Sequence, residues 1–259
     1  LTVNASLLQI GGTSQTANQI AYNGTNSEAD QAGVFIGGRN GRPAVGVTIR
    51  GNSLHDDDGV GIDLGRRHPN PAFSVFIVDG VTANDCLDGD FGPNLLQNYP
   101  LLFEPTENGN GGTTITGYLR GAPAQEFQLD FYSNPTADPS GYGEGAVYIG
   151  SKLIRTSGNG FTTFTHTISG SFLNITATAT DSFGNTSEFS CVAGQCTDPV
   201  RTIEEAEDVL ATSICAEGIV VNITTDESDI DLDDELCDIN TVEPGLQCSL
   251  RAAIEEAER

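Results

Sequence analysis

The stretch from Val45 to Leu102 decides the fold, and it reads VGVTIRGNSLHDDDGVGIDLGRRHPNPAFSVFIVDGVTANDCLDGDFGPNLLQNYPLL. Apolar residues alternate with small or polar ones over 45–49 and again over 60–64, and glycines separate the two runs. Strands this short are not stable alone and need neighbours in a sheet. The second half of the stretch is instead a loop rich in acids, so one architecture ends here and another begins.

The same short pattern occurs upstream, in residues 18–24. With Ile20 placed on Leu54, the chain repeats itself at roughly the period of one coil of a solenoid. The repeat predicts a parallel β-helix in which Asn18 and Asn52 stack as an internal hydrogen-bonded ladder. The apolar side chains expected to face inward are Leu7, Leu8, Ile10, Ile20, Val34, Ile36, Val47, Ile49, Leu54, Ile62 and Leu64.

Longer alternating runs follow between about residue 100 and residue 191. They are bounded by Gly, Pro, Asn and Asp, which is typical of half-buried strands joined by turns. Six or seven such strands predict an immunoglobulin-like sandwich, although the chain has no Trp for the centre of an antibody-type core. The expected strands lie in 114–119, 127–131, 147–149, 161–168 and 173–180.

Four segments carry a resemblance to a known family: NQIAYNG (18–24), GNSLHDDDGVGIDLG (51–65), the loop 79–102, and CSLRAAI (248–254). They resemble bacterial surface proteins with right-handed parallel β-helix repeats and a CSLREA-type motif, here with Ala252 where the motif has Glu. The resemblance implies an all-β chain with three parts. These are the end of a parallel β-helix with its exit loop (1–99), an Ig-like β-sandwich (100–196), and an acidic linker with a strand and helix capping segment (197–259).

The charge of the chain is strongly negative, with 36 acidic residues against 11 basic ones and a formal net charge of −25. Such a surface repels nucleic acid. It is explained either by a solubilising surface, as in a saline habitat, or by cation binding where the acids cluster. We expect no membrane span, because the sequence has no long apolar run, and we read the chain as a mature piece or a fragment.

The six cysteines indicate an oxidising, extracellular or cell-surface location. Two pairs are close in sequence, and we predict the disulfides Cys191–Cys196 and Cys237–Cys248. Cys86 and Cys215 are left open, as is glycosylation at the Asn-x-Ser/Thr sequons, which begin at Asn4, Asn23, Asn174, Asn185 and Asn222.

Two acidic segments are candidate calcium sites, because Ca²⁺ prefers several oxygen ligands converging on one point. The first is the exit loop, with Asn84, Asp85, Asp88 and Asp90 as ligands. The second is an acidic loop near the C-terminus, with ligands at Asp229, Asp231 and Asp233. A solvated polar loop is the alternative in both places.

The two ends of the chain suggest head-to-tail assembly into a fibre or filament. The run at Leu1 and Val3 is strand-like and has no preceding cap, whereas 218–223 and 250–257 resemble a segment that caps a β-helix. The predicted contact residues are Leu1, Val3, Ile219, Val221, Ile223, Leu250 and Ile254. A longer tandem-repeat polypeptide would place the same surfaces in contact covalently, and both explanations remain open.

Two classes of function remain: a structural or adhesive surface module that binds copies of itself, glycans or a cell surface, and a carbohydrate-active β-helix enzyme. His55, Asp56, Asp57, Asp58 and Asp63 are candidate acid–base groups for such an enzyme, but glycoside hydrolysis needs two carboxylates placed across a scissile bond. No nucleophile, phosphate loop or cofactor motif is present. We therefore favour the non-enzymatic module, an adhesin-like repeat protein, with calcium as its expected cofactor.

Overall fold

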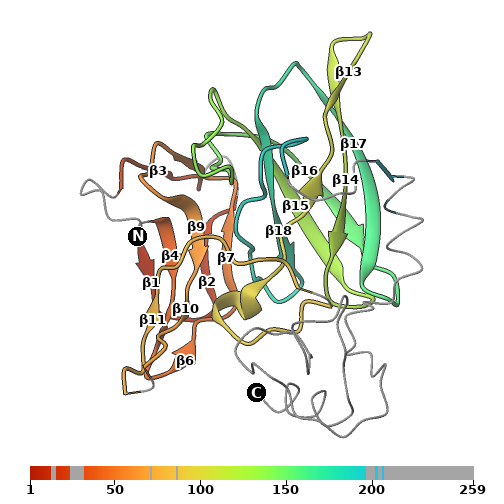
Figure 1. Ribbon diagram of the computed structural model, residues 1–259. Helices are drawn as coiled ribbons and strands as arrows, with labels where there is room; N and C mark the ends of the chain where they lie inside the picture. The colour runs from red at the N-terminus through yellow and green to blue at the C-terminus, as the bar shows by residue number, and fades with distance from the viewer. Residues whose placement is uncertain are drawn as a thin grey trace, which may run out of the picture. The chain divides into compact units, whose positions relative to one another are not determined.

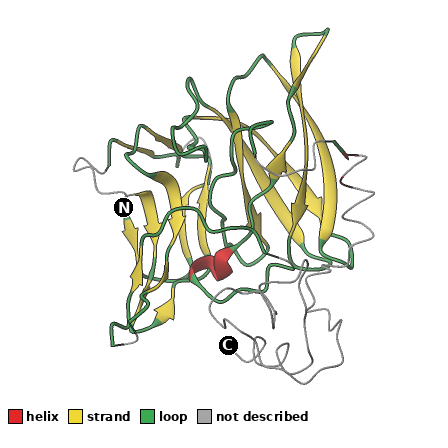
Figure 2. Cartoon of the chain, in the orientation of Figure 1, coloured by secondary structure: helices red, strands yellow, loops and turns green. Residues whose placement is uncertain are grey.

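The computed structural model describes residues 1–12, 16–23, 32–70, 72–85 and 87–196, together with Thr202, Ile203 and Ala206. The chain divides into two compact units, Leu1–Thr212 and Ser213–Arg259, and all described residues belong to the first. The described residues are almost entirely β, as the sequence predicts: up to residue 196 they form the strands β1 to β18 and one short 3-10 helix, η1, at Pro93–Leu96 (Figures 1 and 2).

The first part of the chain forms three sheets of parallel strands (Figure 1). One sheet has the order β1-β4-β9, and the other two are the pairs β2-β7 and β3-β8. The strands are β1 (Thr2–Val3), β2 (Leu8–Gly11), β3 (Gln19–Ala21), β4 (Ala32–Ile36), β7 (Val47–Arg50), β8 (Ser53–His55) and β9 (Val60–Leu64). We call these strands and their connections, residues 1–64, the parallel region.

The register of the parallel pairs confirms the repeat expected from the sequence. Ile20 is the parallel partner of Leu54. The amide of Asn18 donates to Oδ1 of Asn52 at 2.9 Å, and Nδ2 of Asn52 donates to the carbonyl of Ile10 at 2.8 Å. Buried polar side chains need such partners, so the predicted asparagine ladder holds neighbouring segments in register.

The core of the parallel region consists of apolar side chains that alternate along the strands, as the pattern predicts: Val34, Ile36, Val47, Ile49, Leu54, Ile62 and Leu64 are buried. The expectation for Leu7 is wrong, because its side chain is 83% exposed. Leu7 has φ 59°, a left-handed conformation that interrupts the alternation before β2 begins. The expectation for Leu8 is also wrong, because its side chain is 42% exposed although its parallel partner Val47 is buried.

The later part of the chain, residues 101–196, forms two antiparallel sheets that we call the antiparallel region (Figure 1). The first contains β12 (Leu101–Leu102), β13 (Thr106–Asn108), β14 (Gly112–Arg120) and β17 (Phe161–Ser169), and the second contains β15 (Glu126–Ser133), β16 (Val147–Arg155) and β18 (Ile175–Asp181). Both sheets contribute to one buried cluster that includes Ile115, Leu119, Phe164, Phe127, Leu129, Phe131, Ile175, Ala177 and Ala179. Two sheets therefore enclose a common apolar core.

Short elements complete the fold. The hairpin of β5 (Gly38–Arg39) and β6 (Arg42–Pro43) turns at Asn40-Gly41, where both residues have positive φ, the conformation that an Asn-Gly turn favours. The strands β10 (Arg66–Arg67) and β11 (Phe76–Ile77) pair antiparallel. Farther along, the amide of Ala206 donates to the carbonyl of Thr202 at 3.0 Å, which is the spacing of an α-helical turn.

Candidate functional site: the closed edge of the parallel strands

The strands β7, β8 and β9 each lie at an edge of their sheet, and side chains from other segments close these edges. At β7, the amide of Val47 donates to Oδ1 of Asn94 at 2.9 Å, and Nδ2 of Asn94 donates back to the Val47 carbonyl at 2.7 Å. The amide of Ile49 donates to Oγ1 of Thr186 at 2.9 Å, and that of Gly46 to Oδ1 of Asn185 at 2.7 Å. Three side chains thus take the place of a further strand.

The edge of β8 is closed by backbone hydrogen bonds, and the edge of β9 is closed by a side chain. Leu54 and Gly145 exchange two backbone hydrogen bonds of 2.9 Å. Oε1 of Glu188 accepts the amide of Leu64 at 2.7 Å, while Oε2 accepts the amide of Thr82 at 2.7 Å. Burial raises the pKa of Glu188 well above its ordinary value, because the charged form loses water.

Glu144 caps the turn that follows β8. Its two carboxylate oxygens accept the amides of Asp56 and Asp57, at 2.8 and 2.9 Å. Burial raises the pKa of Glu144 to about 7, although these two hydrogen bonds oppose the shift. Its carboxylate therefore supplies the acceptors for two consecutive backbone donors, of which the one in Asp57 is buried.

An ion pair fixes the parallel region against the antiparallel region. Nε and Nη2 of Arg50 donate to the two carboxylate oxygens of Asp130, at 2.6 and 2.8 Å. The Asp130 side chain is 1% exposed, and burial raises its pKa while the guanidinium opposes the shift. The hydroxyl of Tyr132 accepts the amide of Gly51 at 3.0 Å. Removal of either charge would leave the other without its partner, which is costly for a buried group.

Within the described residues, no further strand pairs with the opposite edges of the parallel sheets, and we call these the open edges. Among the described strands, β1, β2 and β3 each pair on one side only, with β4, β7 and β8. Leu1 is 56% exposed and Tyr22 70% exposed beside this edge, whereas Val3 is 6% exposed. Such an edge presents backbone donors and acceptors that another strand can pair with. The predicted contact residues Leu1 and Val3 therefore lie at an open edge.

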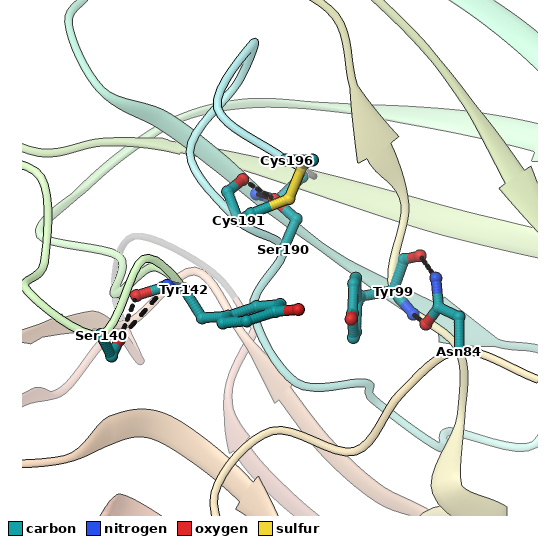
Figure 3. Close-up of a disulfide and its surroundings, with 8 residues drawn as sticks. Asn84, Tyr99, Ser140, Tyr142, Ser190, Cys191 and Cys196 are labelled. Atoms are coloured by element: carbon teal, nitrogen blue, oxygen red, sulfur yellow. Dashed lines mark hydrogen bonds between the residues drawn. A yellow bond between two sulfur atoms is a disulfide. The ribbon is translucent and has the colours of Figure 1, made fainter. Parts of the chain in front are cut away.

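In the exit loop, the predicted calcium ligands Asn84 and Asp88 form hydrogen bonds with residues farther along the loop. Asn84 exchanges two hydrogen bonds with the backbone of Tyr99, of 2.8 and 3.0 Å (Figure 3). The Asp88 carboxylate accepts Nε2 of Gln97 at 2.6 Å and the amide of Asn98 at 2.8 Å. Burial and the nearby charge of Asp85 raise the pKa of Asp88 to about 7. The side chains of Asn84 and Asp88 are therefore hydrogen-bonded to residues 97–99.

Calcium binding in this loop stays a prediction. Asp85 accepts the amide of Gly89 at 3.2 Å, and Asp90 is partly exposed. No group of three His, Cys, Asp or Glu side chains in the described part of the chain is spaced to hold a metal ion. The second predicted site, at Asp229, Asp231 and Asp233, lies outside the described residues.

The loop 138–145 lies beside a cavity of about 690 Å³ whose lining includes Asp57, Asp58, Asp138, Ser140 and Tyr142. The disulfide Cys191–Cys196, which the sequence predicts, lies above Tyr142 of this loop in the view of Figure 3. Tyr142 forms a β-bridge with Cys191, and its ring meets the ring of Tyr99 edge to face at 5.9 Å. The disulfide therefore anchors the segment against which the loop pairs.

The candidate acid–base residues His55, Asp57 and Asp63 form hydrogen bonds within the fold. Nδ1 of His55 lies 2.7 Å from Oδ2 of Asp56. Oδ1 of Asp57 accepts the amide and the side-chain amide of Asn23, at 2.9 and 2.8 Å. Oδ2 of Asp63 accepts the amide of Gly80 at 2.8 Å. These side chains position the backbone around the turn and the exit segment.

Sequence reasoning missed the residues that close the edges, because each acts across a long separation in the chain. Asn185, for example, lies 139 residues from Gly46. Its only sequence signal was the sequon it begins, but its side chain is buried and donates to Asp181 at 2.8 Å. The side-chain amides of Asn23 and Asn174 are likewise hydrogen-bonded, whereas Asn4 is exposed.

The remaining predicted residues lie outside the described residues: Cys86, Cys215, Cys237, Cys248, Ile219, Val221, Ile223, Leu250 and Ile254. No helix within the described part of the chain is long and apolar enough to span a bilayer. No protein-family model matches the sequence, and no curated protein shows significant similarity to it.

Proposed function

We propose that the chain is a structural or adhesive module of an extracellular or cell-surface protein, in which the last coils of a right-handed parallel β-helix join an immunoglobulin-like sandwich. The parallel strands in register, the asparagine ladder and the change to antiparallel sheets support this architecture. The disulfide supports an oxidising location. The four segments that resemble bacterial surface β-helix repeat proteins point the same way.

The closed edge at β7, β8 and β9 is the observation that carries the proposal. A stack of parallel strands exposes backbone groups at each end, and burying them without partners costs free energy. Here one end is sealed by Asn94, Thr186, Glu188 and the bridge from Gly145. A module built this way would end a stack of parallel strands at the junction with the antiparallel sheets.

The open edge gives the module its proposed partner, which is a second copy joined head to tail. Residues 218–223 and 250–257 of one copy, which the sequence predicts to form a strand and a helix, would cover β1, β2 and β3 of the next. The two surfaces differ, so the contact is heterologous and repeats into a fibre unless a rotation closes a ring. Calcium held by the exit loop would add rigidity to each copy.

Sedimentation velocity over a range of protein concentrations tests this proposal on the full chain. The expected result is a mass that rises with concentration, and a monomer at all concentrations for Leu8→Lys, which places a charge on the open edge. Leu173→Lys is the matched control, because Leu173 is 68% exposed in the antiparallel region. A monomeric wild type, or equal association of the two variants, would contradict the proposal.

A further inference from the structure

The antiparallel region has one side on which both sheets end in a strand with a single partner. Among the described strands, β16 pairs with β15 alone and β17 with β14 alone (Figure 1). The other edge of the second sheet, at β18, is instead covered by backbone hydrogen bonds from Ser187, Ser190 and Ala193. Edge strands offer free backbone donors and acceptors to other molecules, so β16 and β17 are a place where a second chain could pair.

The strand β16 has the length and the surface of an interface. It contains nine residues, and its side chains of Val147 and Leu153 are 56% and 60% exposed. Pairing with another strand would remove such apolar surface from water, which favours association. Something in this strand is therefore needed to keep the edge free.

Lys152 is the only lysine of the chain, and it lies on the inner face of β16. Its antiparallel partner is Leu129, which is fully buried, and directly opposed residues lie on the same face of a sheet. Ile154, two positions along the same face, is buried, whereas the intervening Leu153 is exposed. Among the described residues, no ion pair includes Lys152. A charge that faces inward on an edge strand is one way in which proteins discourage pairing.

The facing strand β17 offers no counter-charge. On its inner face, the ring of His166 stacks on the buried ring of Phe131, with the centroids 5.4 Å apart. Burial and the charge of Lys152 both lower the pKa of His166, so the two side chains lie within electrostatic reach of each other. Neither β16 nor β17 contains an acidic residue. A strand added to β16 would cover the ammonium group of Lys152 against a face that has no carboxylate to pair with it.

The backbone of β16 adds a second obstacle beside Lys152. Phe131 is opposite Gly150 and Tyr132 is opposite Tyr148, so Ile149 is an extra residue in β16. Such a bulge bends the strand and increases its twist, which makes a straight pairing harder. The regular part of the edge is thereby limited to residues 150–155, with Lys152 inside it.

We propose that Lys152 keeps β16 from pairing with β16 of a second copy of the chain. Pairing of the two edges would join the sheets, and the ammonium group of each copy would lose water on the inner face of the joined sheet. Burying a charge without a partner is costly, so the exposed apolar edge stays single. The head-to-tail contact uses β1, β2 and β3, and the inference is independent of it.

Sedimentation velocity of the full chain tests the inference in the background of Leu8→Lys, which is designed to block the head-to-tail contact. The association constant of Leu8→Lys alone is the reference. Adding Lys152→Val is expected to raise it by at least about tenfold, because the joined sheet no longer buries a charge. Lys152→Thr gives the same comparison if the valine variant does not fold. Amides in residues 150–155 are expected to exchange more slowly as the dimer forms.

Two control variants separate the position of the charge from its presence. Lys152→Arg keeps a charge on the inner face and is expected to associate no more than the reference. Arg155→Val removes one positive charge from the same strand, so its net charge equals that of Lys152→Val. The Arg155 side chain is 61% exposed, however, and would stay in water in a dimer. Arg155→Val is therefore also expected to match the reference.

Three results would overturn the inference. The first is association of Lys152→Val and Lys152→Thr no stronger than the reference. The second is equal association of Lys152→Val and Arg155→Val, because the net charge of the chain would then be the cause. The third is association of Lys152→Val without protection of residues 150–155, which would place the contact on another surface.

Discussion

The substitution Thr186→Val tests the closed edge of β7 most directly, because it removes one hydroxyl and keeps a β-branched side chain of similar shape. Oγ1 of Thr186 accepts the amide of Ile49 at 2.9 Å and is hydrogen-bonded to Oγ1 of Thr180 at 2.9 Å. Thr186 is fully buried, so the amide of Ile49 would lose its acceptor without gaining water. An unsatisfied buried donor costs about 1–3 kcal/mol and the lost hydroxyl pair about 1 kcal/mol more, which predicts a loss of about 2–4 kcal/mol.

The neighbouring Thr178→Val is the matched control. Thr178 is equally buried, but its hydroxyl has no hydrogen-bond partner. Replacing it removes a desolvated polar group, so the free energy of unfolding is expected to stay the same or to rise by about 1 kcal/mol. Urea unfolding followed by tyrosine fluorescence measures both variants, since the chain has six Tyr and no Trp. Equal stability of the two variants would refute the capping role of Thr186.

Three further predictions follow from the ion pair, the raised carboxyl pKa values and the exit loop. Arg50→Met is expected to lower the free energy of unfolding by about 3–5 kcal/mol, because it leaves the buried Asp130 carboxylate without its partner. The double variant Arg50→Met/Asp130→Leu should recover most of this loss. If urea unfolding shows no recovery, the ion pair does not have the proposed role. Asp88 and Glu144 have pKa values raised to about 7, so the native state holds their protons more tightly than the unfolded chain. The stability they contribute is present below their ordinary pKa values and is lost as the pH rises through about 7. Melting temperatures should therefore fall between about pH 4 and about pH 7, and Asp88→Asn should flatten that fall. Calcium is expected to raise the melting temperature of metal-stripped protein through residues 84–90, and an unchanged melting curve would exclude this role.

The parallel region could be predicted from the sequence because its information is periodic. The alternation of apolar residues and the offset between matching segments place Ile20 on Leu54 and Asn18 on Asn52, and the structure confirms both pairs. In a stacked repeat, each residue contacts the residue at the same position of the neighbouring repeat, so one pattern specifies many contacts. The prediction that Leu7 faces inward is wrong because its left-handed backbone interrupts the alternation. A leucine in the sequence gives no sign of such a conformation.

The closed edge could not be predicted, since its residues act alone and across long separations. Asn94, Asn185 and Thr186 lie in loops whose sequences are compatible with ordinary turns, and their partners on β7 are backbone groups that carry no sequence signal. Glu144 lies at the end of a loop that the sequence marks only as a turn. Recognising such caps requires knowing which backbone groups remain unpaired, and that depends on the assembled sheets.

The acidic residues illustrate the limits of composition. The density of Asp in the exit loop predicts a cation site, yet the Asp88 carboxylate is occupied by Gln97 and Asn98. The sequence makes Asp57 a candidate acid–base group, whereas its contacts place it in a buried turn beside a cavity. The same residue type serves as a cap, a buried partner of arginine and a cavity wall, because its environment decides its role.

Amide hydrogen exchange, measured residue by residue in dilute and concentrated protein, tests the central claim that the parallel strands are sealed at one edge and open at the other. The amides of Val47, Ile49 and Leu64 are expected to exchange slowly at both concentrations, because Asn94, Thr186 and Glu188 hold them. Amides on the outer side of β1, β2 and β3 are expected to exchange rapidly in dilute protein and to become protected as copies associate. Rapid exchange at β7 and β9 would contradict the sealed edge, and rates at β1 to β3 that ignore concentration would contradict the open one.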